Sequence, residues 1–139
     1  MKKIVTLALT AVMALVSCGK DDNPQNQDKI VNPLIGTWDI QTKTVNGVLK
    51  KLSDCDRKEV LVFTDKTINR IESEMKEGIC TPLGDDIATY TISGNKFIET
   101  SDNEKEEFTF TVNDNMLTMN LVEQDDKVII TTITTYKKR

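Results

Sequence analysis

From residue 36 to the C-terminus, short runs rich in Thr, Val, Ile and Phe are separated by Gly, Asn and Asp. Several of these runs alternate apolar and polar residues, and no helix-length window shows apolar residues at a spacing of 3.6. The pattern therefore predicts an all-β domain. The eight predicted strands lie near residues 37–45, 59–64, 67–73, 86–93, 95–101, 105–112, 116–124 and 127–137. Eight short strands joined in sequence are typical of an up-and-down barrel or a sandwich.

The alternation also predicts which side chains face the interior, because successive residues of a strand point to opposite faces. In the run 107–112, for example, Phe108 and Phe110 share one face while Thr109 and Thr111 share the other. The candidate interior residues are Phe63, Ala88, Tyr90, Ile92, Phe97, Phe108, Phe110, Leu117, Met119 and Leu121. The last strand carries apolar residues on both faces, so its register stays open and a bulge is one solution.

The connections between the predicted strands are of two kinds. In an up-and-down array, loops after even-numbered strands lie at one end and loops after odd-numbered strands at the other. Those after even strands are tight, at 64–66, 94–95 and 113–115. Those after odd strands include two long loops, 46–58 and 74–85, besides 102–104 and 125–126. One end is therefore predicted to be closed by tight turns, and it also holds the start of the first strand and the end of the last.

The N-terminus has the pattern of an export signal. Lys2 and Lys3 precede an apolar stretch, residues 4–16, that is too short to cross about 30 Å of hydrocarbon as a helix. The sequence Leu15-Val16-Ser17-Cys18 resembles the bacterial lipoprotein signal, which implies cleavage before Cys18 and acylation of that cysteine, for example by palmitate. Two or more acyl chains suffice for stable membrane anchoring. The alternative is an ordinary signal peptide with a cysteine near its end.

The polar residues 19–33 have little to bury and are predicted to form a flexible tether. A coil of this length would hold a domain roughly 20 Å from the lipid. Lys20-Asp21-Asp22 resembles the short export signal that sends some Bacteroidetes lipoproteins to the cell surface, although solvated linker charges explain it equally well. The predicted organisation is a signal peptide at 1–17, an acylated cysteine and tether at 18–33, and a β-domain at 34–139. The predicted location is the outer membrane, at the cell surface or on its periplasmic face.

Charge and composition exclude several functions. The formal charge of −4 becomes −6 when the signal, with Lys2 and Lys3, is removed, and no basic stripe is present. Nucleic acid is therefore not an expected partner. The chain has no histidine, the commonest zinc ligand and general base. We expect no cofactor, no metal and no catalysis.

Acidic residues gather at the expected end with the long loops. They are Asp54, Asp56, Asp85, Asp86, Asp102, Glu104, Asp125 and Asp126. Solvated carboxylates are ordinary at hairpin ends, and nothing matches the calcium-loop pattern. A rim of this kind would repel anionic ligands on entry.

Cys55 and Cys80 lie in the two long loops and therefore at the same end of the array. In an exported protein this placement predicts a disulfide bond across the rim. With about 25 residues between the cysteines, the chain-entropy model gives roughly 3 to 3.5 kcal/mol of stabilisation. Free thiols with a redox role are the alternative, although the spacing resembles no redox pair.

Gly36-Thr37-Trp38, at the opening of the first strand, resembles the G-x-W signature of lipocalins. Residues 34–139 as a whole are similar to the lipocalin-like domains of Bacteroidetes lipoproteins. The resemblance implies a small eight-stranded antiparallel up-and-down β-barrel in which Trp38 packs across the closed end. It also implies a cation over the indole from the end of the last strand, for which Arg139 or Lys137 is the candidate.

Three functions are compatible with this domain. An eight-stranded barrel either fills with side chains or holds one small ligand. The first hypothesis is a membrane-anchored lipoprotein whose barrel binds a small apolar or amphipathic molecule. The second is a module with a filled barrel that presents loops 46–58 and 74–85 to a protein or a glycan. The third, a hydrolase that uses two rim carboxylates, has the least support.

Overall fold

The computed structural model describes residues 31–139. The predicted signal peptide, Cys18 and most of the predicted tether lie outside the described residues. The elements are β1 (Gly36–Val45), β2 (Val48–Lys50), the 3-10 helix η1 (Asp56–Lys58), β3 (Val60–Phe63), β4 (Thr67–Lys76), β5 (Ile79–Ser93), β6 (Lys96–Ser101), β7 (Glu104–Asn113), β8 (Met116–Asp125) and β9 (Val128–Lys138). Within the described range, no helix is long and apolar enough to cross a membrane.

The strands form one antiparallel sheet that closes on itself. From β3 to β9 each strand pairs with the next along the chain, and β1 pairs with both β3 and β9. This confirms the predicted eight-stranded up-and-down barrel. The short β2 is an addition, since it pairs with the far end of β1 on the edge that β3 has left.

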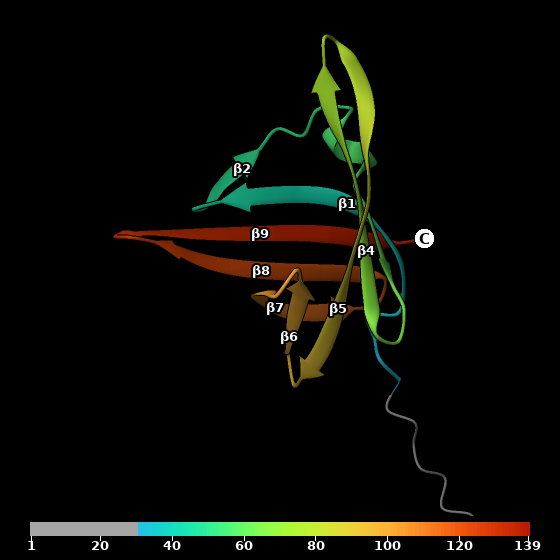
Figure 1. Cartoon of the computed structure of the whole chain (residues 1–139), viewed down its shortest axis with the longest axis vertical. Coiled ribbons are helices and arrows are strands. Elements are labelled where there is room, and N and C mark those ends of the chain that lie inside the picture. Colours follow the sequence, from blue (N-terminus) through green and yellow to red (C-terminus); the bar gives the residue numbers. More distant parts are fainter. Residues whose placement is uncertain (1–30) are drawn as a thin grey trace, which may run out of the picture. The chain divides into compact units, whose positions relative to one another are not determined.

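The prediction of a long loop at 74–85 is wrong. There β4 and β5 continue as one long hairpin, from Thr67 opposite Thr89 to Lys76 opposite Ile79, which Figure 1 shows rising beyond the barrel. The turn is Glu77-Gly78, with φ values of 49° and 80°, as in the type I′ hairpin turn, which has positive φ at both central positions. Pro82 and Gly84 hide the strand in the sequence, because proline within a strand is tolerated only at an edge or a bulge and glycine weakens a strand. The register shifts there, between Glu72 and Ser73.

The region predicted as loop 46–58 is only partly irregular. Asn46 and Gly47, both with positive φ, make a tight turn into β2, and η1 follows before β3. Backbone and side-chain hydrogen bonds join Asn46 to Thr131 of β9, at 2.8 Å each. The β1–β2 hairpin therefore extends the β8–β9 side of the barrel.

At the end away from the tight turns, neighbouring hairpins separate. β5 pairs with β6 only from Thr89 onward, and β7 pairs with β8 only from Phe108 onward. Within residues 31–139, β4 is paired only with β5 beyond Ile71, and the β6–β7 hairpin has no other partner past these pairs, whereas β9 stays paired with β1 as far as Val45. Figure 1 shows the β4–β5 hairpin diverging from the β8–β9 hairpin at this end. The divergence opens a mouth, which we call the open end; the end with the tight turns is the closed end.

The register of the last strand, open from sequence, is set by β8 and β1. Thr134 and Tyr136 are 8% and 2% exposed and face inward, whereas Ile133 is 37% exposed and faces outward. β9 pairs with β8 without interruption, and the irregularity lies instead in β1, between Ile40 and Thr42.

Candidate functional site

The closed half of the barrel is filled by apolar side chains, aromatic rings above all. Phe97 lies at its centre, stacked on Phe108 with ring centroids 4.8 Å apart. Phe63 meets Tyr90 and Phe97 edge-on, at 5.4 and 5.9 Å. Such contacts stabilise a core beyond the area that they bury. The interior of this half is therefore occupied by packed side chains.

Eight of the ten predicted interior residues are buried. They are Phe63, Ala88, Tyr90, Phe97, Phe108, Phe110, Leu117 and Met119. Leu121 is half-buried against this cluster. Ile92 is 39% exposed, so its prediction as an interior residue is wrong. Ile92 is the last residue of its face on β5 before the turn at Gly94, where the barrel ends and little remains to cover the side chain.

The closed end is shut by Leu34 and Trp38, both with no exposed surface. The indole Nε1 donates a hydrogen bond to the Leu34 carbonyl at 2.7 Å, which fixes the chain as it enters β1. Lys138 lies over the ring, with its Nζ 5.2 Å from the centroid. The prediction of Arg139 or Lys137 in this role is therefore wrong. Trp38 pairs with Lys138 across β1 and β9, and Arg139, one residue on, instead forms an ion pair with Asp39 at 2.8 Å.

A cavity of about 180 Å³ lies on the open side of the aromatic layer. Its apolar floor is formed by Phe108, Met119 and Leu121. Its other walls carry Lys43, Glu59, Arg70, Glu72, Glu106, Thr132, Thr134 and Tyr136. A second cavity, of about 260 Å³, adjoins it through Arg70 and Glu106 and is bordered by acidic residues, among them Asp86 and Glu99. The first is smaller than most drug-sized ligand pockets, which span roughly 300–1,000 Å³.

Sequence reasoning missed these charged wall residues, although the alternation contains a signal for them. Glu106 has the parity of Phe108, Glu99 has that of Phe97, and Asp86 has that of Ala88. Each lies one inward position closer to the open end than its apolar neighbour. Following the inward face along the whole strand, past its last apolar residue, would have found them.

Arg70 is the central charged group of the site. Its Nη2 donates a hydrogen bond to Glu99 Oε2 at 3.1 Å, and the two side chains are only 19% and 9% exposed. Burial lowers the pKa of Arg70, but nearby carboxylates, Glu99 first and then Glu59 and Glu72, outweigh it and raise the pKa overall. Burial raises the pKa of Glu99, and Arg70 offsets this only in part. A buried charge of this kind is costly unless paired.

A second polar contact lines the same cavity as Arg70. The hydroxyl of Tyr136 donates to Glu59 Oε1 at 2.6 Å. Burial, and then the negative charge of Glu59, raise the pKa of Tyr136 well above its ordinary value. Tyr136 therefore remains a neutral donor at physiological pH.

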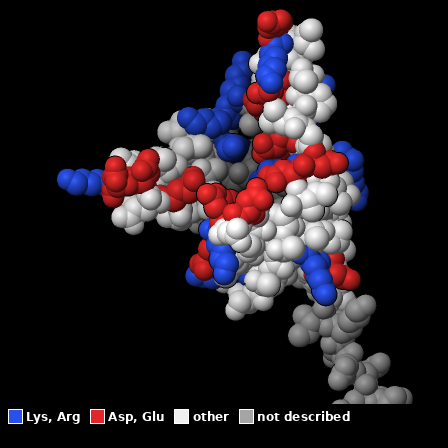
Figure 2. Space-filling model, viewed as in Figure 1, with Lys and Arg blue, Asp and Glu red and all other residues white. Residues whose placement is uncertain are grey.

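The mouth is acidic on balance. Of the predicted rim residues, Asp86, Asp102 and Glu104 line the second cavity. Figure 2 shows acidic side chains around a hollow on this face, with a basic group inside it. Asp125 and Asp126 are at the tip of the β8–β9 hairpin instead. No group of three potential metal-ligating acids or cysteines was found among residues 31–139.

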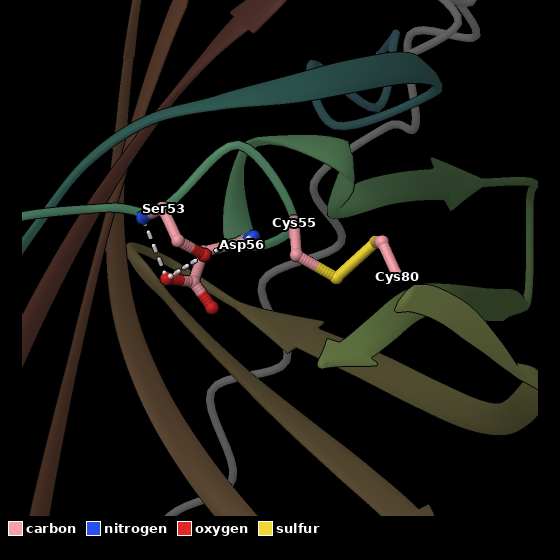
Figure 3. The surroundings of a disulfide bond; sticks show 4 residues. All are labelled: Ser53, Cys55, Asp56 and Cys80. Atoms are coloured by element: carbon pink, nitrogen blue, oxygen red, sulfur yellow. Dashed lines mark hydrogen bonds between the residues drawn. A yellow bond between two sulfur atoms is a disulfide. The ribbon is translucent and has the colours of Figure 1, made fainter. Parts of the chain in front are cut away.

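Cys55 and Cys80 form a disulfide bond, with Cα atoms 5.5 Å apart. It ties the segment before η1 to the start of β5, as Figure 3 shows. Beside it, Asp56 Oδ2 accepts hydrogen bonds from the backbone and hydroxyl of Ser53, both at 2.8 Å. These bonds, the backbone one first, lower the pKa of Asp56. The segment 53–58 is thereby held beside β4 and β1, where β3 no longer reaches.

The family model of the lipocalin-like domain matches residues 34–119. The chain belongs to the lipocalin-like domain family. Solved structures similar to this lipocalin-like chain include a possum milk whey lipocalin, trichosurin, with bound 4-ethylphenol: 10% identity, TM-score 0.48, covering 73% of each chain. An odorant-binding protein has 12% identity and a TM-score of 0.49, covering 77% of this chain and 72% of its own. The fluorescent protein UnaG has 14% identity and a TM-score of 0.40, covering 79% and 100%. No curated protein sequence matches the chain.

Proposed function

We propose that this protein is a lipid-anchored binding protein that takes the polar end of a small amphipathic molecule into the cavity at the open end. The observation that carries the proposal is the position of that cavity, which lies between the filled aromatic half and the acidic mouth. Buried aromatic side chains occupy the closed half of the barrel, so the ligand is expected at the open end. A molecule with both polar and apolar parts matches a floor of Phe108, Met119 and Leu121 beneath charged walls.

Native mass spectrometry of the protein purified from its own host tests this proposal. We expect a bound mass on the wild type. Leu121→Trp, which fills the cavity from β8, should lose that mass, whereas Thr111→Trp on the exposed face of β7 should retain it. Unliganded wild-type protein, or binding that survives Leu121→Trp with the fold intact, would contradict the proposal.

The anchor is part of the same proposal and rests on the sequence at Cys18. Cys18→Ser should abolish incorporation of labelled fatty acid and release the protein from the membrane fraction. Protease added to intact cells should degrade the wild type if it is displayed on the outer surface of the outer membrane. Protection until the outer membrane is permeabilised would place it on the periplasmic face instead.

The alternative function is a protein- or glycan-interaction module at the open end. It is favoured by the apolar side chains that the β4–β5 hairpin exposes, with Met75, Ile79 and Ile87 55%, 69% and 60% exposed. A Met75→Ser, Ile79→Ser variant should then lose partner capture while small-ligand binding in the cavity continues. Catalysis is not proposed.

A further inference from the structure

We propose that Arg70 selects the ligand and that the ligand presents a neutral hydroxyl group to it. The acidic mouth would disfavour ligands that carry a carboxylate instead. This inference rests on the proposed binding function and adds the chemistry of the ligand's head group.

The guanidinium of Arg70 has more donors than partners. A guanidinium carries five N–H donors, and within residues 31–139 Arg70 donates one hydrogen bond, to Glu99. The side chain is 19% exposed and borders both cavities. Its other N–H groups are open to solvent in the cavities, since the only buried side-chain atoms without a partner in residues 31–139 are Asn69 Oδ1 and Asn120 Oδ1. An acceptor on a ligand in the first cavity can therefore take one of these donors in place of water.

The surrounding carboxylates require a hydrogen-bond donor on the ligand. Glu59, Glu72 and Glu106 line the first cavity and can only accept hydrogen bonds when ionised. They outnumber the cations Arg70 and Lys43 in the same walls, and the second cavity adds further acids. A carboxylate ligand would satisfy Arg70 but would meet repulsion from these acids.

A hydroxyl group satisfies both requirements with one atom. Its oxygen accepts from Arg70, and its O–H donates to a neighbouring carboxylate such as Glu106. An ammonium group is attracted by the acidic mouth and donates to the carboxylates, but it offers no acceptor to Arg70, whose charge repels it. The apolar part of the ligand would then lie on Phe108, Met119 and Leu121 at the floor.

Three probes with six carbon atoms each and different head groups test the inference: 1-hexanol, hexanoate and hexylammonium. They are titrated at pH 7 into the protein carrying Cys18→Ser, which needs no detergent, and binding is followed by NMR shifts of the Arg70 Nε–H and the Met119 methyl group. We expect hexanol to bind and to shift both signals. Hexanoate should bind about tenfold more weakly, since it meets like charges, and hexylammonium should also bind more weakly than hexanol.

Two variants assign the effect to named residues. Arg70→Met, combined with Glu99→Gln so that no buried charge is left unpaired, should weaken hexanol binding about tenfold through loss of a charged hydrogen bond. Glu106→Gln should strengthen hexanoate binding. Lys105→Met, which changes an exposed neighbour of Glu106 on β7, is the matched control and should leave the binding of all three probes unchanged. A thermal unfolding transition verifies the fold of each variant, and the ranking of the probes on the wild-type barrel needs no variant.

The outcomes separate this inference from the function on which it rests. If none of the three probes binds, the proposed small-ligand function fails together with the inference. If hexanoate or hexylammonium binds more tightly than hexanol, or if a folded Arg70 variant binds hexanol like the wild type, the ligand function survives and the role of Arg70 is overturned.

Discussion

The ammonium of Lys138 lies 5.2 Å from the ring centroid of Trp38, across the pair of strands that closes the barrel. One residue enters the first strand and the other ends the last, so the contact joins the two ends of the β-domain. The indole is fully buried. The stem of Lys138 also passes close to Gly36, where a Cβ would meet it.

Removing the charge of Lys138 should destabilise the closed end. Lys138→Met keeps an apolar stem over the indole and loses the cation, at an expected cost of about 0.5–2 kcal/mol in the free energy of unfolding. Urea unfolding followed by the fluorescence of Trp38, the only tryptophan, measures it. Arg139→Met is the control, because its ion pair with Asp39 is exposed and should matter less. An equal loss in both variants would contradict the cation–indole assignment.

Gly36→Ala should cost more stability than Gly47→Ala. Both glycines have positive φ, 134° and 78°, so both variants strain the backbone. A Cβ on Gly36 would also lie 2.7 Å from Lys138 Cε, whereas one on Gly47 would meet nothing within 4 Å. We expect an additional loss of about 1 kcal/mol at Gly36. Lys138→Ala in the Gly36→Ala background should remove that difference, and a strictly additive double variant would show that the contact is not its cause.

Loss of the disulfide should lower the stability of the barrel without opening its core. The bond closes a loop with a sequence separation of 25, for which the chain-entropy model gives about 3 to 3.5 kcal/mol. The Cys55→Ser, Cys80→Ser variant and the reduced wild type should show the same loss in urea unfolding. Cys18→Ser, which leaves this bond intact, is the control. A loss of unfolding free energy well below 1 kcal/mol would mean that its hydrogen bonds hold segment 53–58 in place without the disulfide bond.

Alkaline pH should destabilise the protein through its two tyrosines. Burial, chiefly, raises the pKa of both Tyr90 and Tyr136, that of Tyr136 well above its ordinary value. Unfolded tyrosine ionises near pH ~10, so the folded state favours the protonated form. Stability is therefore intact below that pH and falls as the pH rises above it. Tyrosinate absorbance should appear together with unfolding, and Tyr136→Phe should make stability fall less steeply above pH ~10.

Shortening Phe97 should cost far more than shortening Ile92, although the two residues face each other across β5 and β6. Phe97 has no exposed surface and contacts four other rings, so Phe97→Ala should cost about 3–5 kcal/mol. Ile92 is 39% exposed, and Ile92→Ala should cost about 1 kcal/mol or less. Thermal unfolding of both variants measures the difference. Similar losses of stability in the two variants would mean that the side chain of Ile92 is more fully buried near Gly94 than the structure shows.

Much of the barrel follows from the sequence alone. Alternation of side chains along a strand is a local property, so eight strands and most of the inward residues, including Phe97 and Phe108, could be predicted. Cys55 and Cys80 could be paired because loop order in an up-and-down array places them at one end. The long β4–β5 hairpin could not be predicted, since Pro82 and Gly84 look like loop residues until a bulge accommodates them.

The tertiary structure decided everything that depends on strands meeting across the barrel. Which cation covers Trp38 depends on the β1–β9 register, and a shift of one residue separates Lys138 from Arg139. Arg70 on β4 and Glu99 on β6 are 29 positions apart, and the pairing of β5 with both strands brings them to one cavity. Local patterns determine which face of a strand points inward, whereas the divergence of the hairpins at the open end determines where the inward face stops being core and becomes a site.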